Sequence, residues 1–161
     1  DSFSESNVAL CDDVIDRLIP KATAPALAEL SNSLTAAGKR PAKALARLAT
    51  HDNIRVAGPL LQSPALDDEV LAAVAGSKGP DHLARIATRP QLTPAVTDAI
   101  VPRANADVAR DLAANPGAAF SEIGFVKLIN RAKEDKDLGR VLQRRTDIPP
   151  ELEPFLKLAL T

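Results

Sequence analysis

The chain has 161 residues, 45% of them hydrophobic and 25% charged, as expected for one soluble folded domain. This composition excludes disordered and collagen-like classes, and the lack of a long uncharged apolar run argues against a membrane-spanning protein. Twenty basic residues against 21 acidic ones give a net charge of −1, which provides no general attraction for the phosphates of nucleic acids.

The counts of aromatic residues and cysteine limit further which kinds of binding site the chain can contain. Four Phe residues, with no Tyr or Trp, leave few side chains that could stack on bases, and the composition favours Ala-rich helices over sheet. Cys11 is the single cysteine, so a disulfide framework and a thiolate metal site are both excluded, and a reducing, cytoplasmic location is expected. Because the chain contains no Met, we expect it to be the N-terminal part of a longer protein.

A repeat of 26 residues organises the chain. Pro64, Pro90 and Pro116 are 26 residues apart and close the similar phrases LLQSPAL, IATRPQL and LAANPGA. A related phrase, LQRRTDI, follows after a step of 30 residues. Apolar residues recur with the 26-residue step at three further sets of positions: Leu60, Ile86 and Leu112; Leu66, Leu92 and Ala118; and Val74, Ile100 and Val126.

Each repeat predicts two helices joined by a tight turn. Proline lacks the N–H that a continuing helix needs, so one helix is expected to end beside it and the next to begin at a nearby N-cap. The expected ends are Ser63, Arg89 and Asn115, and the expected N-caps are Asp67, Thr93 and Asp147. In chain order, the predicted helices are a leading helix over 8–19 and five pairs: 24–37 with 41–50, 53–62 with 67–75, 81–88 with 93–101, 106–115 with 119–131, and 133–145 with 149–160.

The repeat also predicts how the helices pack. One pair of short amphipathic helices cannot bury its apolar face, whereas stacked pairs form a continuous core. The sequence therefore predicts an all-α, right-handed α-solenoid of about five αα-hairpins behind a leading N-terminal helix, in a single repeat domain over 1–161.

A family resemblance rests on four phrases: HDNIRVAGPLLQSPALDDEVL, HLARIATRP, VTDAIVPRANADVARDLAANPGAAFSEIGF and RRTDIPPELEPFL. From about Phe3 to Leu160 the chain resembles an alphaproteobacterial family, domain of unknown function 2336. The resemblance implies a bacterial cytoplasmic protein with HEAT-like helical repeats. No catalytic residues are established for this family, so none can be assigned to this chain by the resemblance. Other HEAT-type proteins offer two precedents by fold alone, namely protein scaffolds and DNA-alkylation-repair glycosylases.

Two segments depart from the regular pattern. Gly58 and Pro59 fall inside the predicted helix 53–62, where the proline should kink or break it; the defect either bends the stack or exposes carbonyls to a ligand. In the predicted helix 119–131, apolar residues that include Phe120 and Phe125 surround the whole circumference. We expect this helix to be enclosed by its neighbours, or its outer face to be covered by a second subunit in a homodimer or by another part of a longer chain.

A row of cations is predicted near the C-terminal end. Arg110 and Arg140 occupy equivalent positions on successive first helices, and Arg144 lies one turn beyond Arg140. Asp107 and Asp137 each precede one of these arginines by three residues, so ion pairs on the helix surface are expected to neutralise much of the row.

No catalytic, cofactor-binding or metal site is predicted. His51 and His82 lie 31 residues apart in different repeats, and each stands at a helix terminus, where a capping role is expected. The phrase GSKG at 76–79 matches no phosphate-binding loop. An enzyme would instead need a deep pocket in which carboxylates and a His from several repeats converge.

We therefore predict a noncatalytic scaffold that binds another bacterial protein through its curved surface. The candidate contacts are Arg110, Arg140, Arg144, Phe120 and Phe125. The alternative is a nucleic-acid or phosphate-ligand binding module that uses segment 127–145, in which seven basic and three acidic residues give a local net charge of +4. The near-neutral charge of the whole chain argues against nucleic acid as the partner.

Overall fold

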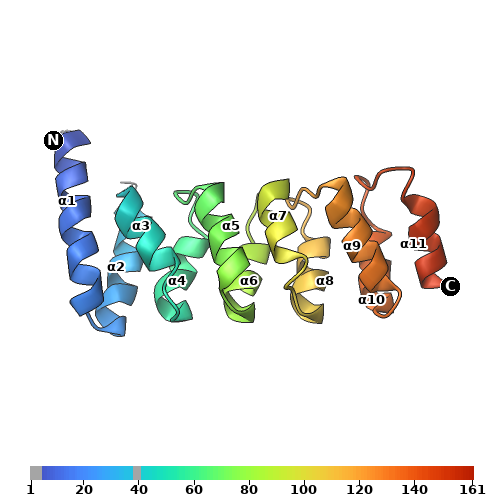
Figure 1. Cartoon of the computed structure of the whole chain (residues 1–161), viewed down its shortest axis with the longest axis horizontal. Coiled ribbons are helices and arrows are strands. Elements are labelled where there is room, and N and C mark those ends of the chain that lie inside the picture. Colours follow the sequence, from blue (N-terminus) through green and yellow to red (C-terminus); the bar gives the residue numbers. More distant parts are fainter. Residues whose placement is uncertain (1–4, 38–40) are drawn as a thin grey trace. The chain divides into compact units, whose positions relative to one another are not determined.

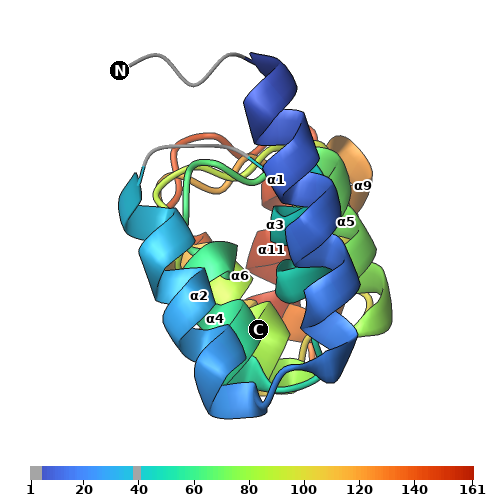
Figure 2. The same ribbon diagram turned by 90° about the vertical axis from the view of Figure 1, so that its left-hand side faces the viewer.

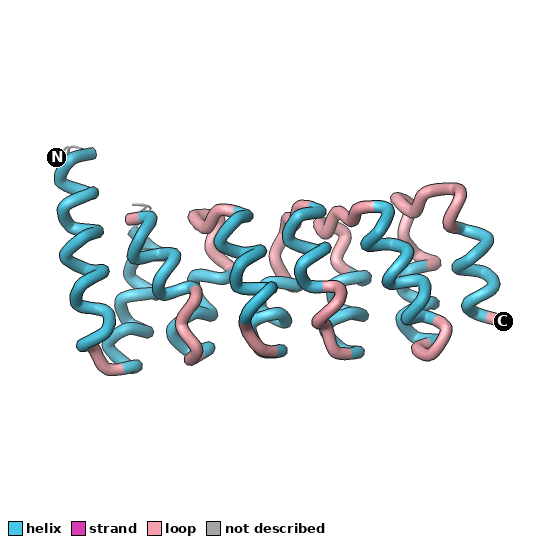
Figure 3. The backbone as a smooth tube through the Cα atoms, viewed as in Figure 1, coloured by secondary structure: helices cyan, strands magenta, loops and turns pink. Residues whose placement is uncertain are grey.

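Helices joined by short loops form the structure, a computed structural model that describes residues 5–37 and 41–161 (Figure 3). This part of the chain contains eleven α-helices and one short 3-10 helix, and the predicted all-α class is confirmed. The helices are α1 Glu5–Leu18, η1 Ile19–Lys21, α2 Ala24–Ala37, α3 Ala42–Ala49, α4 Ile54–Leu61, α5 Asp68–Ser77, α6 Pro80–Ala87, α7 Pro94–Ile100, α8 Ala106–Ala114, α9 Glu122–Ala132, α10 Lys136–Leu142 and α11 Glu153–Leu160.

Two compact units, residues 1–74 and 75–161, divide the chain within α5. In unit 1, α1 packs against α3, and α2 packs against α4 (Figure 2). In unit 2, α8 packs against both α6 and α10, while α9 packs against both α7 and α11 (Figure 1). Alternate helices of unit 2 are therefore neighbours in space and form two layers, which share a core that includes Ile86, Ile100, Leu112, Leu128, Leu138 and Leu142.

A carboxylate from α1 caps the start of α3 in unit 1. The Asp12 side chain is buried and accepts hydrogen bonds from the backbone N–H groups of Lys43 (2.9 Å) and Ala44 (2.7 Å). The N-cap of α3 itself is Pro41, which offers no side-chain bond. The first N–H groups of a helix have no partner within it, so Asp12 supplies from 31 residues away what the local sequence lacks.

Helix ends in one layer of unit 2 are bonded by a side chain from the next repeat. Asn115 Nδ2 donates to the carbonyl oxygens of Ala87 (2.8 Å) and Arg89 (2.7 Å). Arg145 Nη1 donates to the carbonyl oxygens of Ala113 and Asn115, both at 2.9 Å. Ala113 lies 26 residues after Ala87, so the same two carbonyl positions are bonded in successive repeats.

The other layer of unit 2 uses arginine in the same way. Arg103 Nη1 donates to the carbonyl oxygen of Ala75 (2.8 Å), near the end of α5, and Arg131 Nη1 donates to that of Val101 (2.9 Å), just after α7. Ala75 and Val101 are again 26 residues apart. The last carbonyls of a helix have no partner within it and carry partial negative charge, so a guanidinium both bonds them and complements the helix dipole.

The turns of successive repeats also bond to each other in unit 2. Leu92 N–H donates to the carbonyl of Gly117, and Ala119 N–H donates to the carbonyl of Leu92, both at 2.9 Å. A Cβ atom at position 117 would lie only 1.9 Å from the Pro90 carbonyl oxygen. The close approach of the two turns therefore requires glycine at this position.

The predicted helix 119–131 begins later than expected, because the turn-to-turn bonds occupy its first residues. Ala119 is bonded to Leu92, and the first helical residue is Glu122. Ser121 is the N-cap, and its Oγ accepts a hydrogen bond from Gly124 N–H at 3.0 Å.

The last predicted pair, 133–145 with 149–160, is also shorter than expected. The N-cap of α10 is Asp135, whose side chain accepts from Leu138 N–H at 3.1 Å, and α10 ends at Leu142. Asp147 was expected to cap the final helix and does not, because its carboxylate pairs with Arg145. After two consecutive prolines the chain forms a turn, and α11 begins at Glu153.

Pro59 does not interrupt its helix. It lies inside α4, which continues to Leu61, and Gly58 beside it is buried. The predicted break of the helix at Pro59 is therefore wrong. Packing of α4 against α2 and α3 holds the helix together despite the hydrogen bond that proline cannot donate.

Replacement of Gly117 tests the turn contact. Gly117→Ala forces the turns of two repeats apart and should lower the free energy of unfolding by about 2 kcal/mol, measured by urea denaturation. Gly76→Ala is the control: a Cβ there meets nothing within 4 Å, and the change should be neutral or stabilise α5 by about 0.5 kcal/mol. Equal effects of the two substitutions would contradict this account of Gly117.

Candidate binding surface

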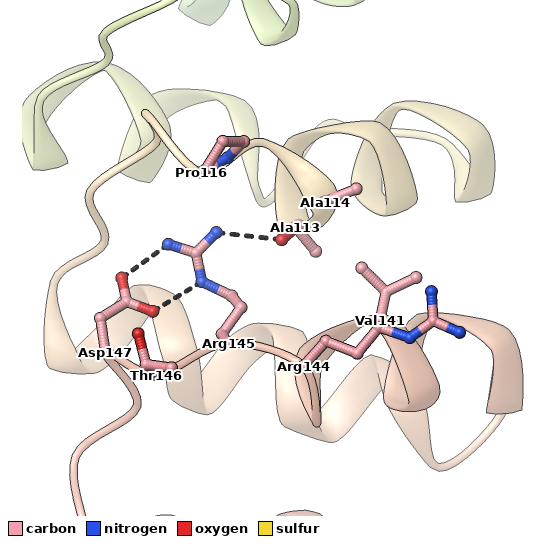
Figure 4. Close-up of a pocket in the computed structure, with 8 residues that line it drawn as sticks. All are labelled: Ala113, Ala114, Pro116, Val141, Arg144, Arg145, Thr146 and Asp147. Carbon is pink, nitrogen blue, oxygen red and sulfur yellow. Dashed lines mark hydrogen bonds and ion pairs between the residues drawn. The ribbon is translucent and has the colours of Figure 1, made fainter.

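Arg145 is the most highly bonded side chain in unit 2. It is 8% exposed, and the five N–H groups of its guanidinium face five acceptors. Nη1 donates to the carbonyls of Ala113 and Asn115, and Nη2 donates to the carbonyl of Ala118 at 2.7 Å. Nε and Nη2 also donate to the Asp147 carboxylate at 2.8 and 2.6 Å (Figure 4). No donor of Arg145 is left over for a ligand.

The two phenylalanines predicted as partner contacts pack beneath this arginine. The ring centroids of Phe120 and Phe125 are 5.2 Å apart, and the Arg145 guanidinium lies 4.8 Å and 5.9 Å from them. Phe125 is 2% exposed, and Phe120 is half-buried in the loop before α9. Both side chains therefore take part in the packing of unit 2. Phe125 is buried, so we correct its assignment as a partner contact, whereas Phe120 stays partly exposed.

Arg144 differs from its neighbour in its surroundings. It points away from Arg145 and Asp147 (Figure 4), and it is exposed, with no hydrogen-bond or ion-pair partner among the residues described. Both arginines line a cavity of about 350 Å³ at the ends of α8 and α10. Its lining residues are Ala113, Ala114, Pro116, Val141, Arg144, Arg145, Thr146 and Asp147.

Arg110 is anchored to the N-cap of the next helix in its layer. Its Nε and Nη2 donate to both carboxylate oxygens of Asp135 at 3.0–3.2 Å, while Asp107 lies 3.6 Å from Nη1. The Arg110 guanidinium lowers the pKa of Asp135, and Asp135 raises the pKa of Arg110. The predicted pair with Asp107 is present, but the stronger contact with Asp135 could not be read from helical spacing.

Most cations of segment 127–145 serve structural contacts. Arg140 forms the predicted pair with Asp137 at 2.8 Å. Arg131 donates to the carbonyls of Val101 and Ala104, Lys136 donates to that of Ala159, and Arg145 is saturated. The remaining cations of this segment are Lys127, Lys133 and Arg144, which are exposed and have no polar partner in the described parts of the chain.

Large apolar side chains are exposed on two packed helices of unit 2. On α9, Ile123 is 66% exposed and Val126 is 38% exposed. On α11, Phe155 is 59% exposed and Leu158 is 70% exposed. Because α9 and α11 pack against each other, we call these four residues the α9–α11 face. Sequence periodicity suggested that α9 is apolar all round, but it could not separate exposed Ile123 from buried Phe125.

Unit 1 carries a second exposed apolar stripe. Leu10, Val14 and Leu18 follow each other at intervals of four residues along α1, and each is more than half exposed. Cys11 is exposed beside this stripe.

His51 has the local role predicted for it, since its Nδ1 accepts a hydrogen bond from Asn53 N–H at 3.0 Å.

No group of three or more His, Cys, Asp or Glu side chains is placed to hold a metal ion within residues 5–37 and 41–161. None of the helices described above is long and apolar enough to cross a membrane.

The fold and this surface define an all-helical protein with exposed apolar side chains on two packed helices. Residues 56–153 match the family described as "uncharacterised protein conserved in bacteria", domain of unknown function 2336, and the chain belongs to that family. The family named from its sequence phrases is thereby confirmed over these residues. Searches of curated proteins and of solved structures gave no match.

The neighbouring arginines Arg144 and Arg145 offer a matched test. Arg145→Ala leaves three carbonyls and Asp147 without their donor and should lower the free energy of unfolding by about 3 kcal/mol. Arg144→Ala removes an exposed side chain and should change it by less than about 0.5 kcal/mol. Urea denaturation measures both free energies of unfolding. Equal effects of the two substitutions would contradict the claim that the hydrogen bonds of Arg145 stabilise the fold.

The contact between Arg110 and Asp135 predicts a dependence on pH. The folded pKa of Asp135 lies below its usual value of 3.8, so its stabilising contribution is present above about pH 4 and is lost as the pH falls through the folded pKa. Asp135→Asn keeps an N-cap side chain but removes the carboxylate. The wild type should therefore unfold at higher urea than this variant at about pH 7, and the difference should shrink at about pH 3.

Asp111→Asn on the exposed side of α8 is the control for this comparison. A gap between wild type and Asp135→Asn that stays constant across the pH range would contradict the electrostatic account.

Proposed function

We propose that this chain is a noncatalytic helical-repeat module that binds another bacterial protein through the α9–α11 face. We further propose that its repeats are HEAT-like and form an α-solenoid. The 26-residue period supports this arrangement, as does the recurrence of the same inter-repeat bonds at Ala87 and Ala113 and at Ala75 and Val101.

The proposal rests on the four exposed apolar side chains of the α9–α11 face. Soluble proteins rarely expose adjoining large apolar side chains without a binding role, and here two packed helices each expose two. Ser121 caps the start of α9, and Lys136 bonds the Ala159 carbonyl near the end of α11, so the surface is formed before a partner arrives. Binding then costs little conformational entropy.

The use of cations inside unit 2 supports a protein partner over a nucleic acid. Four of the seven basic residues in segment 127–145 bond to carbonyls or carboxylates of the chain itself. Arg145, the most deeply placed of them, has no donor left for a phosphate. The positive charge counted along the sequence therefore overstates the charge that a ligand would meet.

Paired substitutions test the proposal. The variant with both Ile123→Ser and Phe155→Ser should keep its fold, because both side chains are exposed, and should lose its partner from an extract of a bacterium that carries the family. We expect affinity capture to fall at least about tenfold. The control variant carries Leu10→Ser and Leu18→Ser on α1, which has the same chemistry in unit 1, and should capture the partner as the wild type does.

Two results would count against this function. If the wild type and the variant with both Ile123→Ser and Phe155→Ser capture the partner equally well, the α9–α11 face is not the binding surface. Binding of a DNA duplex at low salt that survives the same substitutions would favour the nucleic-acid alternative.

A further inference from the structure

Lysines surround the α9–α11 face. Lys127 follows Ile123 by one helical turn and adjoins Val126, and Lys157 adjoins Leu158. Lys133 follows the end of α9. These three side chains are exposed and have no hydrogen-bond or ion-pair partner in residues 5–37 and 41–161. The face therefore combines apolar contact area with lysines that form no ion pair in the described residues.

Acidic residues on the same helices form no ion pair with these lysines in the described residues. Glu122 and Glu153 lie in the first turns of α9 and α11, where the helix dipole favours a negative side chain. No ion pair joins either of them to a lysine in the described part of the molecule. The later turns of both helices, where Lys127 and Lys157 lie, thus present positive charge beside apolar side chains.

A cavity of about 400 Å³ adjoins Lys127 between the end of α7 and α9. The guanidinium of Arg131, which lines it, is bonded to the carbonyls of Val101 and Ala104. The remaining polar side chains of the lining are Lys127 and Asn130, and both can donate hydrogen bonds. A carboxylate on a partner could therefore be received here by two donors.

We propose that the occupant of the α9–α11 face is an amphipathic helix of a partner protein with an acidic polar side. A third helix can pack against two helices that lie side by side, and the four apolar side chains of the face would contact its apolar stripe. Asp or Glu side chains flanking that stripe would pair with Lys127, Lys133 and Lys157. This inference rests on the proposed function and specifies the partner's chemistry.

A second copy of the chain fits this face less well. The exposed stripe of α1 is apolar, but the neighbouring carboxylates are already engaged within unit 1. Asp13 pairs with Lys43, which lowers the pKa of Asp13, and Asp16 pairs with Arg47 at 3.0 Å. Neither of these two carboxylates is therefore available to pair with the lysines of another copy.

Synthetic peptides and the full chain test the inference. The probe is a fluorescently labelled amphipathic peptide with Leu at helical i, i+3, i+4 and i+7 spacing and Glu at its polar positions. A second peptide carries Lys in place of Glu. By fluorescence anisotropy at low salt, the Glu peptide should bind at least about tenfold more tightly than the Lys peptide, and added salt should weaken it.

Charge reversal provides the matched variants. Lys127→Glu should weaken binding of the Glu peptide at least about tenfold and strengthen binding of the Lys peptide. Lys21→Glu reverses an exposed lysine in unit 1 and should leave both affinities unchanged. Circular dichroism of each variant verifies that the helices are intact.

Several results would overturn the inference. They are no binding of the Glu peptide up to about 1 mM, equal binding of the two peptides, preferential binding of phosphatidylserine vesicles, or a dimer in solution that Ile123→Ser dissociates. If Ile123→Ser with Phe155→Ser abolishes capture of the cellular partner while the Glu peptide fails to bind, the proposed function stands and only the acidic helix is rejected.

Discussion

Short helices leave many carbonyl groups without partners, and the packing of unit 2 depends on how those groups are bonded. A helix such as α8, with nine residues, lacks internal partners for its last four carbonyls. Arg145 and Asn115 in one layer, and Arg103 and Arg131 in the other, bond helix ends that lie 26 to 32 residues earlier. Each contact joins one repeat to the one before it. The bonds therefore fix the spacing of neighbouring helices and satisfy the backbone at the same time, which apolar packing alone would not do.

This use of cations also shapes the surface that a partner meets. Arg131 and Arg145, which are bonded to carbonyls, are half-buried or nearly buried, so the positive charge that segment 127–145 presents to solvent is reduced by the structure itself. The exposed lysines of α9 and α11 stand out because they take no part in those bonds. Apolar side chains beside them, on helices that are rigid and already packed, combine the features of a protein-binding face. The proposed function and the stability of unit 2 thus use different members of the same set of basic residues.

The helical pattern could be predicted closely from the period and the prolines. Eleven helices were expected and eleven are present in the described residues, and the departures have local causes. Bonds between Leu92 and Ala119 delay the start of α9, and two consecutive prolines delay α11. The candidate site was harder to predict. Phe120 and Phe125 were candidate partner contacts, yet they pack under Arg145, and helical periodicity cannot tell which apolar side of a helix will be covered when several sides are apolar.

By itself, the sequence determined the all-α class, the 26-residue repeat, the turn positions and the family, because these follow from local residue chemistry and from regular spacing. Only the tertiary structure decided which of two adjacent arginines is saturated, where Asp12 and Asp135 find their partners, and which apolar side chains of α9 remain exposed. In these contacts, groups 25 to 32 residues apart in the sequence come within about 3 Å of each other. Whether they do so depends on how neighbouring helices are placed, and the identity of the two residues alone does not decide it.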